Sequence, residues 1–284
     1  MTQNILNLKR FNTLGLNAYC KSLEVIEKEQ DIKTLIKDSR NTFIILGEGS
    51  NVILDAPIES PFEVPVFINR LKGITVRKNL KQRVIVRCGA GENWNKFVLW
   101  TLENKFGGLE CLAGIPGSVG AAPIQNIGAY GVELQDVFEK CSFVYRNNQI
   151  IETFDKAACK FGYRDSIFKN KFKNKVVITD VSLRLKKRNY KLNTSYGAIE
   201  QKLLSKNISV PSPKDVSDAV INIRSTKLPD PKQLGNAGSF FKNPIVFQSL
   251  PFSTFPPNIV SNFAKALVTS SFHKPPKVFP ISPI

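Results

Sequence analysis

Residues 114–131 read GIPGSVGAAPIQNIGAYG, a run rich in glycine, alanine and proline. Glycine permits backbone angles that a side chain forbids, and proline restricts the chain around it. Backbone N–H groups in such a segment can approach a ligand closely, which is how proteins hold phosphate groups without charged side chains. A buried turn between core strands is the alternative for any single loop of this kind. Because polar residues recur here, at Ser118, Gln125 and Asn126, we favour a pyrophosphate-binding loop that acts with a second loop.

The second loop lies in residues 43–51, which read FIILGEGSN. Residues 43–46 form an apolar run that is typical of a short buried strand, and the GEGSN sequence predicts a sharp turn with exposed N–H groups. The turn shares a strand followed by G-x-G with the dinucleotide-binding fingerprint. It lacks the third glycine and the following helix, since residues 52–54 stay apolar and then meet Asp55 and Pro57. We therefore exclude a Rossmann motif.

Length and composition favour a soluble globular protein of two or three modest domains. The chain has 284 residues, of which 42% are hydrophobic. No apolar run reaches the length of a membrane span, and the N-terminus shows no signal peptide. The five cysteines are scattered and the only histidine is His273, so we expect no zinc or other metal site and a reducing, cytoplasmic location.

The net charge of +17 raises the question of nucleic-acid binding. The lysines are dispersed, with local clusters only at 169–175 and 184–191, and no known DNA-binding pattern accompanies them. We therefore interpret the charge as a compositional bias whose positive field attracts anionic nucleotides. No nucleic-acid or membrane partner is expected.

Three units are predicted along the chain: residues 1–60, 61–211 and 212–284. In the first unit, a helix at 31–39 precedes the strand at 43–46. In the second, we expect a strand at 84–88, a helix at 92–104, a hairpin of 141–145 with 149–151, and a strand at 181–186 with one solvated face. Aromatic residues on the helix at 92–104, such as Trp94 and Phe97, recur at helical spacing, which favours core packing over cofactor contact.

The third unit begins with a clear helix start at Ser212-Pro213-Lys214-Asp215. Serine is a favoured cap, proline suits the first helical position, and an acid suits the first turn. The buried stripe is expected at Val216, Ala219, Val220 and Ile223. Arg224 and Lys227 close the helix, where cations suit its negative end.

Two further short motifs carry polar chemistry. Residues 162–166 read GYRDS, which by itself predicts a surface turn with an Arg164–Asp165 pair. Residues 235–244 read GNAGSFFKNP, a tight glycine turn that presents the hydroxyl of Ser239. From the residues alone, an ordinary turn with a hydrogen-bonding serine is the alternative.

Taken together, these motifs resemble the UDP-N-acetylenolpyruvoylglucosamine reductase family. NTLGLNAYC at 12–20, GEGSN and the 114–131 segment are similar to its flavin-binding half, and GYRDSIFK and GNAGSFFKNP are similar to its substrate half. The similarity extends from about Thr13 to about Pro244. It implies an α+β fold: a two-part FAD-binding fold of the vanillyl-alcohol-oxidase type, followed by a truncated α/β substrate domain.

The resemblance also implies an activity. In this family, NADPH reduces FAD, and the enzyme then reduces UDP-N-acetylglucosamine enolpyruvate to UDP-N-acetylmuramate for peptidoglycan synthesis, and so for cell-wall biogenesis, cell shape and division. It assigns enolate stabilisation to Arg164, proton donation to Ser239, and substrate binding to Tyr163, Tyr196, Lys227 and Asn243. The residues expected to contact FAD are Gly47, Gly49, Ser50, Asn51, Ile115, Pro116, Gly117, Ser118, Val119, Gly120, Gln125, Asn126 and Gly128.

The sequence departs from this family after about Pro244. Residues 245–284 contain no Asp or Glu but seven prolines, six phenylalanines and six serines, and only 262–269 could form a short helix. The catalytic glutamate that family members carry near the C-terminus has no match. We interpret this segment as a foreign or frame-shifted tail, and we expect FAD binding to survive while turnover is strongly reduced or absent.

Three functions therefore stay open at this point. The first is an FAD-dependent NADPH oxidoreductase that acts as a monomer. The second is a catalytically inactive flavin-binding remnant of that enzyme. The third is a basic nucleic-acid-binding protein, which would carry no bound flavin.

Overall fold

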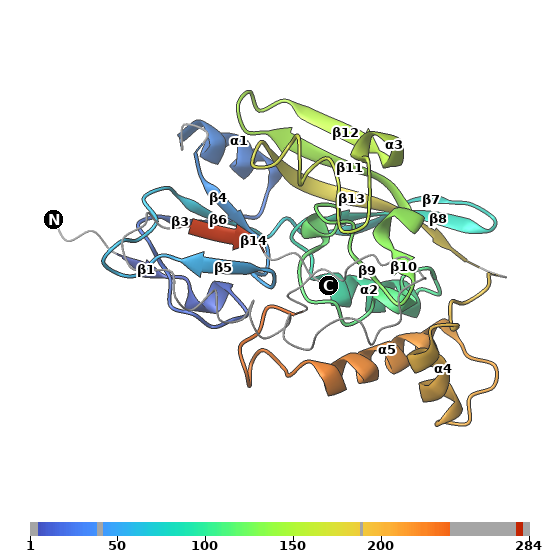
Figure 1. Ribbon diagram of the computed structural model, residues 1–284. Coiled ribbons are helices and arrows are strands. Elements are labelled where there is room, and N and C mark those ends of the chain that lie inside the picture. The colour runs from blue at the N-terminus through green and yellow to red at the C-terminus, as the bar shows by residue number, and fades with distance from the viewer. Residues whose placement is uncertain (1–4, 39–41, 188–189, 239–276, 281–284) are drawn as a thin grey trace, which may run out of the picture.

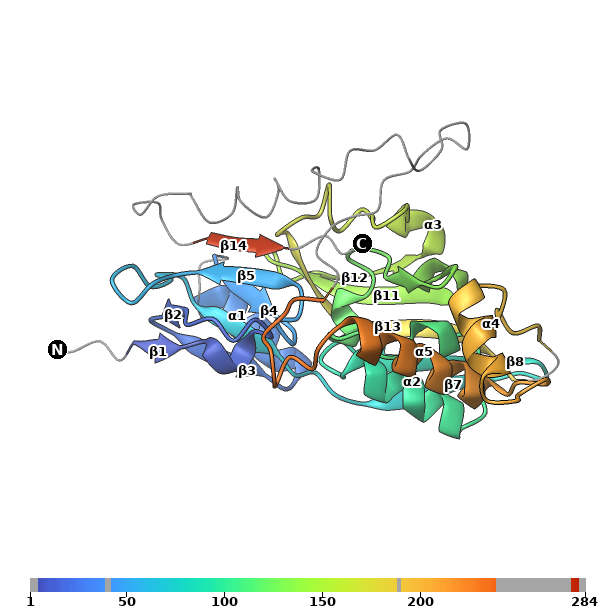
Figure 2. The same ribbon diagram turned by 60° about the horizontal axis from the view of Figure 1, so that its bottom comes forward.

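The computed structural model describes residues 5–38, 42–187, 190–238 and 277–280. Its N-terminal unit lies at one end of the molecule, and a larger antiparallel sheet with its helices lies at the other (Figure 1). Two helices from the last third of the chain lie along the side of this larger unit, as both ribbon views show (Figure 2).

The centre of the N-terminal unit is a parallel sheet in the order β3 (Leu23–Ile26), β6 (Val66–Asn69) and β4 (Ile44–Leu46). Helix α1 (Glu29–Asp38) packs Ile32 and Ile36 against it. The predicted helix and strand are confirmed, with the helix starting two residues before residue 31 and the strand one residue after Phe43.

Shorter elements complete this unit. The strand that follows the GEGSN turn, β5 (Val52–Asp55), pairs antiparallel with β14 (Lys277–Pro280), so the turn leads into a strand and not into a helix. This agrees with the exclusion of a Rossmann motif. The remaining elements are β1 (Leu6–Asn7), η1 (Lys9–Phe11) and β2 (Tyr19–Cys20).

The larger sheet has five strands, and every neighbouring pair is antiparallel. Their order is β12 (Ile151–Asp155), β11 (Phe138–Tyr145), β13 (Val176–Lys186), β8 (Arg83–Gly89) and β7 (Ile74–Asn79). The strand at 84–88 and the hairpin are confirmed. The second hairpin strand begins at Ile151, later than predicted, because Gln149 adopts a φ of +59° and extends the turn.

The prediction of one solvated face for residues 181–186 is wrong at its start. Strand β13 is central in the sheet, and Ser182 is buried like its apolar neighbours Val181 and Leu183. Within residues 181–186, Arg184 is exposed and Lys186 is half-buried. The partners of Ser182 on the neighbouring strands are Lys140 and Arg87, and beside these long side chains the short serine is shielded from solvent.

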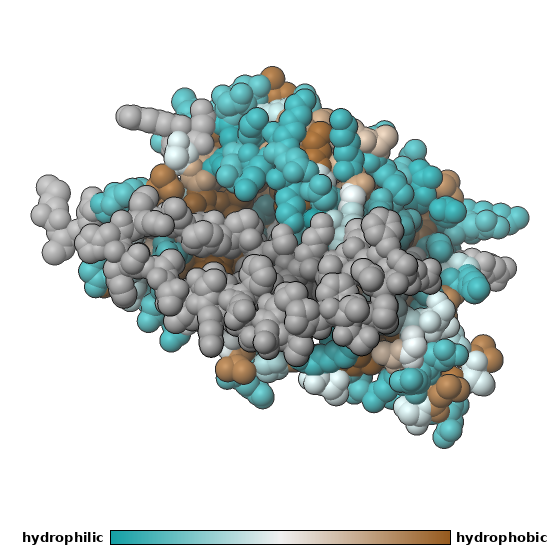
Figure 3. Space-filling view, in the orientation of Figure 1, coloured by the Kyte–Doolittle hydropathy of each residue, from teal (hydrophilic) through white to brown (hydrophobic). Residues whose placement is uncertain are grey.

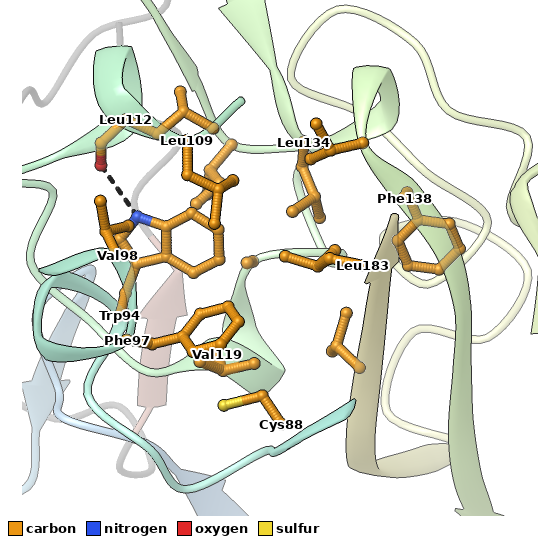
Figure 4. Packing of buried hydrophobic residues seen from close by; sticks show 14 of the residues in the cluster. Cys88, Trp94, Phe97, Val98, Leu109, Leu112, Val119, Leu134, Phe138 and Leu183 are labelled. Atoms are coloured by element: carbon orange, nitrogen blue, oxygen red, sulfur yellow. Dashed lines mark hydrogen bonds between the residues drawn. The ribbon is translucent and has the colours of Figure 1, made fainter. Parts of the chain in front are cut away.

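Helix α2 (Trp94–Glu103) supplies the centre of the main core (Figure 4). Asn93 caps it by accepting a hydrogen bond from the N–H of Lys96, at 2.8 Å, so the helix starts two residues after the predicted residue 92. Trp94 and Phe97 are buried, and the indole Nε1 of Trp94 donates to the carbonyl of Leu112 at 2.9 Å. Their predicted core role is confirmed.

Helix α5 (Pro213–Lys227) begins with the predicted cap, in which Ser212 and Asp215 bond each other's backbone N–H groups. Its apolar stripe joins the same core as the large sheet, so helix α5 packs onto the second unit. The remaining elements are η2 (Glu110–Leu112), η3 (Val119–Ala121), β9 (Gly128–Ala129), β10 (Val132–Glu133), η4 (Leu134–Asp136), α3 (Lys156–Cys159) and α4 (Gly197–Leu204).

Hydrophilic side chains prevail on the described surface of the face shown in Figure 3. In the described ranges, no helix is both long and apolar enough to span a bilayer. The short helix predicted at 262–269 lies outside the described residues.

Candidate functional site

A cavity of about 1460 Å³ lies where the N-terminal unit meets the large sheet unit. Both glycine-rich turns line it, and so does Arg164. Most of the residues predicted to contact FAD face this cavity: Gly47, Gly49, Ser50, Asn51, Ile115, Pro116, Gly117, Ser118, Gln125 and Gly128. Residues that lie more than 60 positions apart in the sequence thus form one continuous wall.

The two turns face each other across small residues. A Cβ atom added at Gly47 would lie 3.2 Å from Cβ of Ser118 and closer still to its hydroxyl. One added at Gly117 would lie 3.0 Å from the hydroxyl of Ser50. Each turn therefore needs glycine where the other presents its serine.

Several backbone N–H groups in both turns have no acceptor within the described part of the chain. Among the described residues, none accepts a hydrogen bond from the N–H groups of Gly49, Ser50, Gly117 or Ser118. The buried side-chain oxygen of Asn51 also has no partner there, although its Nδ2 donates to Gln125 at 3.3 Å. Buried polar groups are costly when unpaired, and a diphosphate with ribose hydroxyls offers both acceptors and donors to match these. The residues present therefore fit the FAD that the sequence predicts.

Three predicted contacts lie behind the cavity wall. Val119 is fully buried in the core. Gly120 donates its N–H to Ala90 at 2.8 Å, and a Cβ there would lie 2.5 Å from that of Ala90. Asn126 is also fully buried, and its Nδ2 donates to Glu133 at 2.8 Å and to the carbonyl of Gly162 at 3.0 Å. These three residues shape the loop and do not line the cavity.

Arg164 is held over the cavity by an uncommon backbone conformation. Its φ is +53°, a left-handed value that a side chain rarely adopts without support. The side chain is buried, its Nη2 donates to the carbonyl of Gly128 at 2.5 Å, and its Cζ lies 5.2 Å from the ring centroid of Tyr163. The expected Arg164–Asp165 surface pair is wrong, because Asp165 accepts hydrogen bonds from Asn170 instead, at 2.9 and 3.0 Å.

The predicted Tyr196 and Lys227 also line the cavity. Tyr196 packs edge-on against Tyr130, with ring centroids 5.3 Å apart. Arg224, which the sequence analysis treated only as a helix-closing cation, also lines the cavity and donates from Nε to the carbonyl of Gly114 at 3.0 Å. Burial lowers the pKa of Arg224. Its spacing of three residues from Lys227 places both on one helix face, a signal that could have identified it.

Two other cavity residues were missed. Glu133 lies beside Arg164, and Arg146 also lines the cavity. Arg146 donates to carbonyls of Asn174, at 2.9 Å, and of Phe43, whose ring it also covers with Cζ 3.6 Å from the centroid. Burial lowers its pKa to about 10. The sequence offered no signal, because Arg146 sits in the Arg-Asn-Asn turn of the hairpin.

Ser239 and Asn243 lie outside the described residues, so their placement is not shown. The part of their motif that is described reaches the cavity through Ala237 and Gly238. The hydroxyl of Thr13 donates to the carbonyl of Asn236 at 2.7 Å, which fixes this end of the motif to the N-terminal unit. Within the described ranges, no cluster of His, Cys, Asp or Glu could hold a metal ion.

Comparison with known proteins identifies relatives on both sequence and fold. A family model for an FAD binding domain matches residues 23–153. The UDP-N-acetylenolpyruvoylglucosamine reductase of Flavobacterium johnsoniae is 48% identical over 87% of this chain and 72% of its own length. The protein of that name from Pseudomonas aeruginosa is 42% identical over 84% of this chain and 70% of its own.

A solved structure supports the fold. The crystal structure of UDP-N-acetylenolpyruvylglucosamine reductase from Thermus caldophilus matches with a TM-score of 0.57 and 24% identity, over 85% of this chain and 74% of that one. Together with the family model, this match confirms the predicted α+β fold with an FAD-binding part.

Proposed function

The chain belongs to the UDP-N-acetylenolpyruvoylglucosamine reductase family, and from this premise we propose that it binds FAD and, with NADPH as reductant, reduces UDP-N-acetylglucosamine enolpyruvate to UDP-N-acetylmuramate. The observation that carries the proposal is that both glycine turns and Arg164 line a single cavity. The product places the protein in peptidoglycan precursor synthesis, in the cytoplasm, with consequences for cell shape and division.

Residues of both turns provide hydrogen-bonding groups that could bind the diphosphate of FAD. The N–H groups of Gly49, Ser50, Gly117 and Ser118, which have no acceptor among the described residues, would donate to it, and Asn51 would add a side-chain oxygen that is likewise unpaired there. Bound there, FAD would supply the hydride chemistry that couples NADPH oxidation to reduction of the enolpyruvyl group. The protein's task is to hold the cofactor, orient the substrate and manage charge.

Arg164 serves the charge that develops on the substrate. Its guanidinium is planar and permanently charged, so it can stabilise the negative charge that spreads into the substrate carboxylate as hydride arrives at the far carbon of the enolpyruvyl double bond. Ser239 then donates a proton to the carbon next to that carboxylate. Tyr163, Tyr196, Lys227 and Asn243 bind the substrate, and the nucleotide diphosphate gains a second cation in Arg224.

The composition of residues 245–284 favours a second outcome. With no Asp or Glu in that segment, no carboxylate there can assist the proton transfer. General acid–base partners contribute about a hundredfold to ten-thousandfold in rate. We propose strongly reduced turnover with FAD binding retained, which in the limit is the inactive flavin-binding remnant.

A two-stage assay tests the proposal. The absorbance spectrum of the purified full chain is recorded first, and a bound flavin band is expected. Substrate-dependent NADPH oxidation is then measured for the wild type and for Ser239→Ala and Arg164→Lys. Slow turnover that both variants lower further supports the reductase, and bound flavin without turnover supports the remnant. A colourless protein that takes up no added FAD overturns both.

The same preparation tests the remaining expectations. We propose that the protein is a monomer. We also propose that it does not bind nucleic acid, because the positive charges are dispersed along the chain. Light scattering gives the mass in solution. Salt-dependent retention of duplex DNA at physiological ionic strength would contradict the absence of nucleic-acid binding.

A further inference from the structure

Glu133 places a carboxylate beside the guanidinium of Arg164 inside the cavity. Its Oε1 lies 3.6 Å from Nη1 of Arg164, and both residues line the cavity wall. The side chain of Arg164 is 9% exposed and that of Glu133 24% exposed, so the pair is largely shielded from solvent screening. No other described carboxylate forms an ion pair with Arg164.

The carboxylate is itself held in place from two sides. Its Oε2 accepts hydrogen bonds from Nδ2 of Asn126 at 2.8 Å and from Nε2 of Gln135 at 2.6 Å. Asn126 is fully buried, has a φ of +46°, and also donates to Gly162 on the turn that carries Arg164. The backbone N–H of Gln135 donates to Oδ1 of Asn126 at 3.0 Å. One amide therefore ties the glycine segment, the carboxylate and the arginine turn together.

Gly128 completes the arrangement from the other side. Its carbonyl accepts from Nη2 of Arg164 at 2.5 Å. A Cβ at this position would lie 2.6 Å from Nη1 of Arg164 and 3.0 Å from Cγ of Glu133. The absence of a side chain at 128 is thus what allows Arg164 and Glu133 to meet.

The geometry of the pair favours orientation over neutralisation. A separation of 3.6 Å is an ion pair but too long for a hydrogen bond. The charge attraction restrains the guanidinium, while the hydrogens on Nη1 stay available for a ligand. A short bidentate pair would instead occupy them.

We propose that Glu133 is a positioning residue: through Asn126 and Gln135 it fixes the guanidinium of Arg164 in the orientation that receives the substrate carboxylate. This role rests on the proposed function for its catalytic consequence, but the restraint on Arg164 belongs to the protein alone. Preorganised charge contributes to rate because it need not reorganise as the reaction proceeds.

The test compares Glu133→Gln and Glu133→Asp with a matched control. Glu139→Gln removes an equivalent carboxylate, which pairs with Arg184 at 2.6 Å on the large sheet and does not line the cavity. Glu133→Gln is expected to lower kcat about tenfold with FAD affinity changed less than about twofold, and Glu133→Asp to recover part of the loss. Glu139→Gln is expected to leave both quantities unchanged.

A double-mutant cycle separates positioning from general stability. In an Arg164→Lys background, Glu133→Gln is expected to lower kcat little further, because the guanidinium that Glu133 positions is no longer present. An additive loss in the two variants overturns the proposal.

A readout that needs no turnover keeps this inference distinct from the proposed function. Side-chain ¹⁵N NMR of arginine-labelled protein, with the Arg164 signal assigned through its loss in Arg164→Lys, reports rotation of the guanidinium. Restricted rotation is expected in the wild type and in Glu139→Gln, and faster rotation in Glu133→Gln. If Arg164 rotates equally in all three, the proposal fails even in an active enzyme. If the wild type shows no turnover but the Arg164 guanidinium rotates faster in Glu133→Gln, the reductase assignment fails and the positioning role of Glu133 stands.

Discussion

The hydroxyl of Ser118 lies in the space that a side chain at Gly47 would need. These residues are 71 positions apart, and each belongs to one of the two turns predicted to grip FAD. The reciprocal contact, between Gly117 and Ser50, follows the same rule. The two turns therefore form one unit. They can approach each other this closely because Gly47 and Gly117 have no side chains.

Gly47→Ala is expected to weaken FAD binding about tenfold, equivalent to about 1.4 kcal/mol, because the new methyl group displaces the Ser118 hydroxyl and separates the turns. Adding Ser118→Gly should recover part of this affinity by restoring the space. Flavin fluorescence titration measures both. Gly197→Ala is the control, since no atom lies within 4 Å of its added Cβ. Equal affinities for Gly47→Ala and the wild type would show that the turns do not depend on this contact.

Gly49→Ala should reduce the free energy of unfolding more than Gly15→Ala does. Both glycines have a left-handed φ, +63° and +67°, so each substitution carries a backbone strain of about 1–2 kcal/mol. Only at Gly49 does the added Cβ also collide with backbone, including Cα of Asn12 at 2.8 Å, while nothing lies within 4 Å at Gly15. Urea unfolding of the two variants compares them, and indistinguishable midpoints would contradict the packing described for the GEGSN turn.

Arg224→Gln should raise the dissociation constant of the UDP-sugar substrate about tenfold. The change removes a partly buried cation from the cavity and the hydrogen bond to Gly114. Lys214→Gln on the same helix is the control, because Lys214 is exposed and pairs with Asp218 at 2.7 Å away from the cavity. Perturbation of the flavin absorbance reports binding without turnover. Similar constants for the two variants would place the nucleotide elsewhere.

The cysteines should be unreactive in the folded protein. All five are buried and free. Burial raises the pKa of Cys111 to about 12 and that of Cys88 further, and a hydrogen bond with Cys159 together with burial raises the pKa of Cys141. A thiol reagent at pH 8 should therefore react only after unfolding, since the thiolate is the nucleophile. Rapid labelling of the native protein would contradict this burial.

The raised pKa values of the cysteines also determine how the stability of the folded protein changes at alkaline pH. A raised pKa in the folded state means that the native protein keeps protons that the unfolded chain releases above about pH 9, the ordinary value for cysteine. Stability is fully present below that pH and should fall as the pH rises from 9 to 12. Thermal unfolding across this range measures the effect, and a melting temperature that rises with pH would contradict the sign.

Local signals explain what the sequence predicted well. The cap at Ser212, the glycines of both turns and the apolar spacing of Trp94 and Phe97 act within a few residues, so their consequences can be read from neighbours. The family resemblance added the flavin and Arg164, which the spacing alone had assigned to a surface turn.

The missed residues depend on partners far along the chain. Arg146 is defined by its contact with Phe43, 103 positions away, and Glu133 by its contact with Arg164. Ser182 is buried because β13 became the central strand, a property of the sheet order and not of the alternation in residues 181–186. None of these long-range contacts produces a periodic pattern of residues from which the sequence could have predicted it.

The most direct test of the account is a titration of flavin-free protein with FAD, followed by quenching of flavin fluorescence, for the wild type and Gly47→Ala. If the paired glycine turns bind the diphosphate, the wild type should bind one FAD per chain and the variant should bind FAD more weakly. The flavin-free forms of the two proteins should have the same melting temperature. A folded wild type that binds no FAD, or binds it with the same affinity as Gly47→Ala, would contradict the claim.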